Sequence, residues 1–288
     1  MKKRGKIIVW PEGGLANRIR VLAFCHQLAE KHQCQLVCCW EINEGLSAHF
    51  ESLFKPTNFI VENVCGHNYL LKRYCNWWPH IRIMYKCIKR YVWLKIHRVD
   101  KWIPSDYVDE IISINNGKQM LCDMIEKNIS VGKTVFLATC EDFGEYNISF
   151  LNPVDSIMEM IKEWLTLFDQ GHNYGLHIRR SDNDKSIEYS PIELFEKVID
   201  SIITKDTLAK FYLATDDSKT AEYLCSKYGN HIVYREKELS RKTENGIREA
   251  LIDMWMLGYM DSIYGSYWSS FSVVASWINS RPYHCLKK

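Results

Sequence analysis

Apolar residues recur along this chain with two spacings, one typical of strands and one typical of helices. The stretch "KIIVW" (6–10) is apolar after its first residue and is followed by the turn "PEGG". In 15–32 the apolar residues Leu15, Ile19 and Leu22 recur at helical spacing. The stretch "QLVCCW" (35–40) is again typical of a strand. This strand–turn–helix–strand order predicts a Rossmann-like unit in the first half.

The pattern becomes regular in the second half. After a strand at 134–140, an amphipathic helix opens at Asn152-Pro153. The predicted elements that follow are strands at 174–180, 210–216, 231–236 and 262–266, and helices from Pro191, from Ser218, around 244–260 and from Ser270. Such alternation implies a parallel sheet covered on both faces. We therefore predict an α/β protein with two Rossmann-like domains, 1–150 and 151–288.

Composition narrows the class of protein. The chain has 288 residues, of which 47% are apolar and 25% are charged, as in ordinary globular proteins. A net charge of +2 argues against nucleic acid as the main partner. Eleven cysteines without a CxxC pair, and the lack of a signal-like start, favour a cytoplasmic location. No stretch approaches the roughly 20 apolar residues that span a membrane.

The stretch 67–101 departs from this average. It carries nine Lys/Arg against one acid, Asp100, with seven Trp/Tyr interleaved. One interpretation is a helical insertion whose aromatic side chains pack inward. The other is a surface that meets anionic lipid headgroups or a lipid-linked acceptor, which would place the protein peripherally at the inner membrane.

The stretch "YGLHIRRSDN" (174–183) holds the main candidate chemistry. It ends a predicted strand, and parallel sheets bind ligands at the carboxyl ends of their strands. Side chains alternate along a strand, so His177 and Arg179 share one face and Arg180 points the other way. Asp182 is placed to neutralise Arg180 or to brace the loop. Arg179 then suits a phosphate, unless both arginines only pair with acids at the sheet edge.

Other predicted strand ends carry polar groups as well. Asp216 ends one strand, and Ser269 and Ser270 open a helix, whose amino end suits a phosphate. In the first half, Gly13 and Gly14 permit a tight turn before a helix whose first turn contains Asn17.

The motifs "GGLANR", "HIRRSDN", "YLATDD" and "SSFS", in this order, resemble those of the GDP-fucose-dependent fucosyltransferases. That group includes the α1,6-enzymes, the nodulation fucosyltransferases and the protein O-fucosyltransferases. The resemblance implies a GT-B fold, two Rossmann-like domains facing across a cleft, with the donor GDP-fucose on the second domain. The segment 42–130 carries none of these motifs.

The resemblance also implies roles for single residues. Arg179 matches the arginine that contacts the donor β-phosphate, and His177 matches a histidine of the nucleotide pocket. Asp253 matches an aspartate on the guanine side, and Ser270 matches the serine of the last motif. Asn17 matches an asparagine near the reacting centre.

Arg180, Asp182 and Asp216 are then supporting residues, and Ser269, Gly13 and Gly14 line the donor site. Two departures limit the match. Ser181 stands where Gly or Thr is usual, and Arg18 follows Asn17 where the α1,2-enzymes have glutamine.

The implied reaction is an inverting, metal-independent transfer of fucose to a glycan or lipid-linked glycan. Asp182-Asn183-Asp184 spells DxD, a manganese signature of other glycosyltransferases, but arginine takes the place of the cation in the family it resembles. Glu12 and Glu41 are positional candidates for a general base. The alternatives are a non-catalytic nucleotide-sugar or glycan-binding protein and a membrane-surface scaffold.

Overall fold

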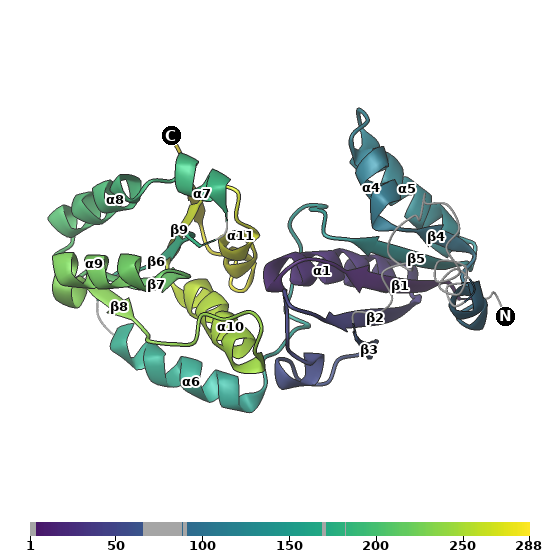
Figure 1. Cartoon of the computed structure of the whole chain (residues 1–288), viewed down its shortest axis with the longest axis horizontal. Coiled ribbons are helices and arrows are strands. Elements are labelled where there is room, and N and C mark those ends of the chain that lie inside the picture. The colour runs from purple at the N-terminus through teal and green to yellow at the C-terminus, as the bar shows by residue number, and fades with distance from the viewer. Residues whose placement is uncertain (1–3, 66–87, 89–90, 169–170, 182) are drawn as a thin grey trace. The chain divides into compact units, whose positions relative to one another are not determined.

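The computed structural model of the chain describes residues 4–65, 88, 91–168, 171–181 and 183–288 (Figure 1). The chain divides into two compact units, Met1–Phe50 with Pro56–Tyr146, and Glu51–Lys55 with Asn147–Lys288. The sequence pattern places the boundary near 150 and gives no sign that 51–55 leave the first unit. Most of the basic aromatic stretch 67–101, up to residue 90, lies outside the described residues except for Ile88.

The first unit is built on a parallel sheet with the strand order β3-β2-β1-β5-β4. Its elements are β1 (Lys6–Pro11), α1 (Leu15–His32), β2 (Gln35–Ile42), β3 (Ile60–Cys65), β4 (Lys101–Ile103), α4 (Ser105–Ile112), α5 (Gly117–Ser130) and β5 (Thr134–Thr139). Every residue of β5 is buried, as expected for a central strand of a parallel sheet.

The second unit repeats this plan with the order β10-β9-β6-β7-β8, again parallel throughout. Its elements are α6 (Asp155–Leu165), β6 (Asn173–Ile178), α7 (Asp184–Tyr189), α8 (Ile192–Lys205), β7 (Lys210–Thr215), α9 (Ser218–Tyr228), β8 (Ile232–Tyr234), α10 (Glu244–Tyr259), β9 (Ser262–Ser266), α11 (Ser270–Trp277) and β10 (Tyr283–Leu286). Short 3₁₀ turns lie at Phe50–Ser52, Thr166–Phe168 and Gly229–His231.

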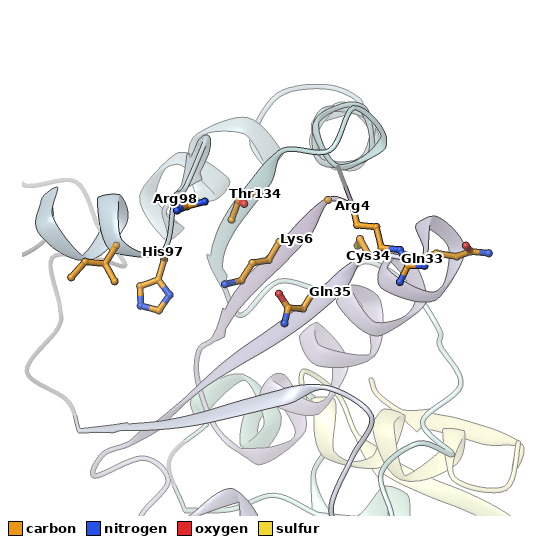
Figure 2. A pocket seen from close by; sticks show the side chains of 10 residues that line it. Arg4, Lys6, Gln33, Cys34, Gln35, His97, Arg98 and Thr134 are labelled. Atoms are coloured by element: carbon orange, nitrogen blue, oxygen red, sulfur yellow. The ribbon is translucent and has the colours of Figure 1, made fainter. Parts of the chain in front are cut away.

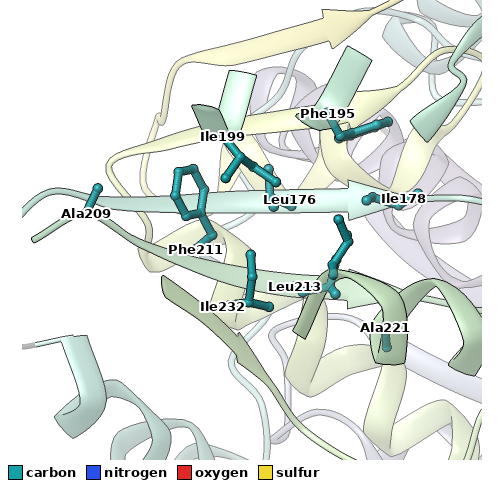
Figure 3. Packing of buried hydrophobic residues seen from close by; sticks show 10 residues of the cluster. Leu176, Ile178, Phe195, Ile199, Ala209, Phe211, Leu213, Ala221 and Ile232 are labelled. Carbon is teal, nitrogen blue, oxygen red and sulfur yellow. The ribbon is translucent and has the colours of Figure 1, made fainter. Parts of the chain in front are cut away.

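The two faces of the second sheet pack against different helices. Alternate residues of β6 and β7, such as Leu176 and Leu213, pack with Phe195 of α8 and Ala221 of α9 (Figure 3). The intervening residues face α10 and α11. A side chain at Gly175 would lie 2.8 Å from a methyl group of Leu257 in α10, so glycine allows this close approach.

The predicted α/β class with two Rossmann-like units is confirmed. The strands and helices expected from apolar periodicity are present with small shifts at their ends. The sequence pattern did not predict β3, β4, β10 or the helices α4, α5 and α7. In the part of the chain that the structure describes, no helix is long and apolar enough to cross a membrane.

The buried cluster of Figure 3 predicts a clear difference between two leucines. Leu213 is fully buried, and Leu208 in the preceding loop is 61% exposed. Leu213→Ala should lower the free energy of unfolding by roughly 2–5 kcal/mol, because it removes buried methyl groups and leaves a cavity. Leu208→Ala should change it by less than about 0.5 kcal/mol. Urea denaturation of the two variants measures the difference, and equal midpoints would contradict this packing.

Candidate functional site

Both sheets have a point at which the strand order reverses. In the second unit the chain runs from β6 outward to β8 and then returns to the other side of β6 with β9. In the first unit it runs from β1 to β3 and then returns to the other side of β1 with β5. Ligand sites of open α/β sheets form beyond the carboxyl ends of the strands at such points. These are the places where "HIRRSDN" and "GGLANR" begin.

Asp216 organises the end of β6. Its carboxylate pairs with Nε of Arg179 at 3.1 Å. It also accepts hydrogen bonds from the backbone N–H of Arg180 at 2.7 Å and from the hydroxyl of Ser181 at 2.7 Å. One acid at the end of β7 therefore fixes three consecutive residues that follow β6. The guanidinium of Arg179 is held by its Nε edge, and its two terminal amino groups form a second edge of the kind that binds phosphate.

Arg180 has a different environment. Its guanidinium donates to the carbonyl oxygen of Arg179 at 3.2 Å and to that of Ser190 at 2.7 Å. Burial lowers the pKa of Arg180, and Asp216 is the nearest compensating charge. These contacts tie the end of β6 to Ser190, the residue that follows α7. Arg180 therefore supports the structure of the loop. Asp182, the expected partner of Arg180, lies outside the described residues.

His177 is buried on the α10 and α11 side of the sheet. Its ring stacks on Phe271 of α11, with the ring centres 4.8 Å apart. Burial, together with the charge of Arg179, lowers the pKa of His177 to about 4. The imidazole is therefore neutral at pH 7. Its Nδ1 is buried and has no hydrogen-bond partner among the described residues.

The loop between β9 and α11 closes over this region. Ser266, at the end of β9, accepts a hydrogen bond from the backbone N–H of Arg179 at 3.1 Å. Asn183 donates to the carbonyl oxygen of Trp268 at 2.9 Å. Ser269 is the N-cap of α11, but its side chain does not cap the helix. Ser269 and Ser270 thus stand at the amino end of a helix beside the strand that carries Arg179.

Asp253 belongs to a buried ionic cluster. Its Oδ1 accepts from Tyr212 at 2.7 Å and from Arg235 at 3.2 Å, and its Oδ2 lies 2.9 Å from Nζ of Lys237. Glu249 pairs with Arg235 and balances the second positive charge. A carboxylate oxygen can accept about two hydrogen bonds. Lys237 is the partner of Oδ2 among the described residues, which leaves acceptor capacity at this atom. Sequence patterns do not predict Arg235 and Lys237 as partners of Asp253.

The first unit presents its glycine turn after β1. Gly13 has φ +80°, and a side chain there would lie 2.7 Å from Nδ2 of Asn17. Glycine is therefore required at this position both for the backbone and for the close approach of Asn17. Gly14 has neither restriction.

Arg18 is fully buried, which its charge did not predict. It donates to the carbonyl oxygen of Gly13 at 2.8 Å, to that of Glu41, and to the side chain of Asn43 at 3.3 Å. Burial lowers the pKa of Arg18 to about 10. Arg18 therefore clamps the glycine turn to the end of β2.

The two candidate bases differ in exposure. Glu41 is 3% exposed and accepts a hydrogen bond from the indole N–H of Trp10 at 3.3 Å. Glu12 follows β1 directly and is partly exposed, so it is the more accessible of the two. For metals, the described residues contain no group of three His, Cys, Asp or Glu side chains that could hold an ion. The first residue of the DxD sequence, Asp182, is not among them.

Comparison with known proteins rests on structure. No protein-family model matches the sequence, and a search of curated proteins finds no relative. The structure is similar to that of NodZ α-1,6-fucosyltransferase co-crystallised with GDP. The two chains are 18% identical, the TM-score is 0.60, and the match covers 96% of this chain and 92% of that chain. A structure of the fucosyltransferase NodZ from Bradyrhizobium is similar as well.

Two further solved structures share the fold. One is an Arabidopsis thaliana FUT1 mutant in complex with GDP, with 15% identity, a TM-score of 0.56, and 99% and 70% of the two chains covered. The other is POFUT1 in complex with GDP, with 15% identity, a TM-score of 0.54, and coverage of 98% and 99%. These similarities establish the fold that the sequence motifs implied.

The buried neutral His177 predicts a pH effect on stability. Its pKa is 6.5 when exposed and about 4 in the folded protein. Between these values the unfolded state binds more protons, so stability falls as the pH falls from 6.5 toward 4. At about 1.4 kcal/mol per pKa unit, the loss due to this group is roughly 3 kcal/mol.

Urea denaturation across this pH range tests the effect with His177→Gln. The wild type should lose roughly 3 kcal/mol more than this variant does. His284→Gln removes an exposed histidine from the same unit and should keep the wild-type dependence. If the free energy of unfolding changes equally with pH in the wild type and in His177→Gln, the imidazole is not held neutral.

Proposed function

We propose that this protein transfers fucose from GDP-fucose to a hydroxyl group of a glycan. The observation that carries the proposal is the position of Arg179, which follows β6 at the reversal of strand order and is oriented by Asp216. The fold that surrounds it is shared with NodZ, which has been co-crystallised with GDP and soaked with GDP-fucose.

The donor is proposed to lie across the ends of β6 and β9. The guanidinium of Arg179 binds the β-phosphate, and the amino end of α11, with Ser269 and Ser270, faces the same diphosphate. His177 is neutral and stacked, so it serves as a rigid wall and hydrogen-bonding group of the nucleotide pocket. The remaining acceptor capacity of Asp253 suits an N–H group of guanine.

The reaction breaks the bond between C1 of fucose and the oxygen of the β-phosphate. The acceptor hydroxyl attacks C1 from the opposite face, its proton passes to a base or to water, and GDP leaves with the bonding electron pair. Negative charge grows on the β-phosphate as the bond breaks. Arg179 binds this charge more strongly than it binds the ground state, and thus lowers the barrier.

The acceptor is proposed to be a glycan or lipid-linked glycan bound by the first unit, with Asn17 near the reacting centre. Gly13 and Gly14 place the turn after β1, and Arg18 fixes that turn. Glu12 is the better-placed candidate base because it is the more accessible acid. We expect the enzyme to work in the cytoplasm and to need no metal, because Arg179 supplies the positive charge that a cation supplies in DxD enzymes.

Replacement of Arg179 tests the proposal directly. Arg179→Ala should lower the rate of fucose transfer by about 10²–10³-fold, the usual effect of removing one donor to a developing negative charge. Lys219→Ala removes an exposed cation from the start of α9 in the same unit and should leave the rate unchanged. Release of GDP and formation of fucosylated product are measured together, with thermal melting as the control for folding.

Two outcomes would contradict the proposal. If folded Arg179→Ala keeps most of the wild-type rate, Arg179 does not stabilise the leaving group. If the wild type binds GDP-fucose in calorimetry but releases no GDP with any acceptor, the chain is a binding protein of the same fold.

Removal of divalent cations provides a separate test. Because the positive charge comes from Arg179, we expect activity to survive an excess of EDTA. The measurement is the initial rate of GDP release with and without the chelator, followed by addition of manganese. A rate that falls on chelation and returns with manganese would instead assign the DxD sequence a metal-binding role.

A further inference from the structure

A polar cavity lies at the amino ends of the strands of the first sheet. It has a volume of about 660 Å³ and opens between the starts of β1, β2 and β5 (Figure 2). Its polar lining comes from Arg4, Lys6, Gln35, His97, Arg98 and Thr134. Since β1 is six residues long, this cavity and the glycine turn at its other end are about 20 Å apart. The cavity is therefore separate from the site that begins at Gly13.

The cavity carries an excess of positive charge. Arg4, Lys6 and Arg98 line it, and none of the three forms an ion pair with a described residue. No acid among the described residues lines the cavity. Asp100 accepts a hydrogen bond from the backbone N–H of Thr134 at 2.8 Å, and the charge of Glu62 acts on His97. Three cations gathered around a hollow repel one another, and an anion bound between them relieves this repulsion.

The rim of the cavity is apolar and exposed. Residues 91–96 are helical, and Ile96, which is 70% exposed, also lines the cavity. Ile88, Val92 and Ile96 are spaced four residues apart, and Tyr91 adjoins them; all four are exposed. An apolar helical face beside basic side chains is typical of segments that lie in the membrane interface.

The inner side of this segment is already accounted for. Trp93 and Leu94 pack against the sheet cluster that contains Trp10 and Phe136. Trp93 also stacks on His97, with ring centres 3.9 Å apart. The segment is thus anchored by one face, and its opposite face is presented to solvent next to the three cations. Packing within the first unit accounts for the face with Trp93 and Leu94. It does not account for the exposed face with Val92 and Ile96.

We propose that this cavity binds the phosphate of an anionic phospholipid headgroup while Tyr91, Val92 and Ile96 enter the interface. Arginine and lysine recognise the phosphate, and the apolar rim favours a phosphate attached to lipid over a soluble one. The proposal stands apart from the sugar transfer proposed above. It assigns a membrane-contacting role to the amino-end edge of the first sheet.

The test is sedimentation of the full chain with vesicles of pure phosphatidylcholine and of equal parts phosphatidylcholine and phosphatidylglycerol. We expect binding to the second kind only, weakened by added salt. Arg4→Gln/Arg98→Gln removes two exposed cations of the cavity. Because each cation near an anionic surface contributes about fivefold, affinity should fall by about 25-fold.

The control pair Lys118→Gln/Lys127→Gln removes the same charge from α5 of the same unit and should bind as the wild type does. For the apolar rim, Ile96→Ser should weaken vesicle binding, whereas Ile114→Ser, at an equally apolar exposed position, should not. Thermal melting confirms that all variants are folded.

A second experiment distinguishes a phosphate attached to lipid from a soluble phosphate. Inorganic phosphate and glycerol phosphate are added in thermal-shift experiments to the wild type and to Arg4→Gln/Arg98→Gln. Stabilisation of the wild type alone, without vesicle binding, would overturn the lipid assignment. If Arg4→Gln/Arg98→Gln and the control pair bind vesicles equally well, the cavity is not the binding site. If the wild type neither binds vesicles nor is stabilised by soluble phosphates, the whole proposal is wrong.

Discussion

The candidate site depends on the contacts that the carboxylate of Asp216 makes with the residues after β6. This carboxylate bonds to the Arg179 side chain, the Arg180 backbone and the Ser181 hydroxyl, so it sets the path of the chain as it leaves β6. Its negative charge also acts on both adjacent guanidinium groups, as the ion pair with Arg179 and the electrostatic effect on Arg180 show. The same acid holds Arg179 near a buried, neutral His177, which adds no further positive charge. The proposed diphosphate site thus combines an oriented cation with a neutral histidine.

The first unit achieves comparable order with a buried cation. Arg18 binds two carbonyl oxygens and an amide oxygen, and its guanidinium lies 5.2 Å from the ring centre of Trp40. A buried arginine is tolerated because backbone and amide acceptors replace water around it. Both units therefore have an arginine that holds the loop after their first strand, Arg18 in the first unit and Arg180 in the second. In the second unit the neighbouring Arg179 is the arginine that faces the proposed donor. The sequence contexts of Arg18 and Arg179 alone do not separate these roles.

Much of the fold could be predicted because the central strands are continuous apolar stretches between helical periods. The edge strands β3 and β10 could not, since "IVENVC" and "YHCL" mix polar and apolar residues and are defined by pairing with distant strands. The positions of the candidate residues followed from the rule that parallel strands end at one edge of a sheet. Their partners did not follow, because contacts such as that between Asp253 and Lys237 depend on tertiary packing.

The buried cluster around Asp253 bears on the selectivity of the nucleotide pocket proposed above. Two cations and two acids balance each other there, and a buried charge that loses its partner is strongly unfavourable. A ligand group that approaches Asp253 must therefore donate a hydrogen bond, since an acceptor would meet the carboxylate with like polarity. Guanine offers N–H donors on its Watson–Crick edge. A base that presents an acceptor atom at this position would be repelled by the carboxylate of Asp253. If the proposed donor site is correct, the charge balance inside the second unit contributes to the choice of base.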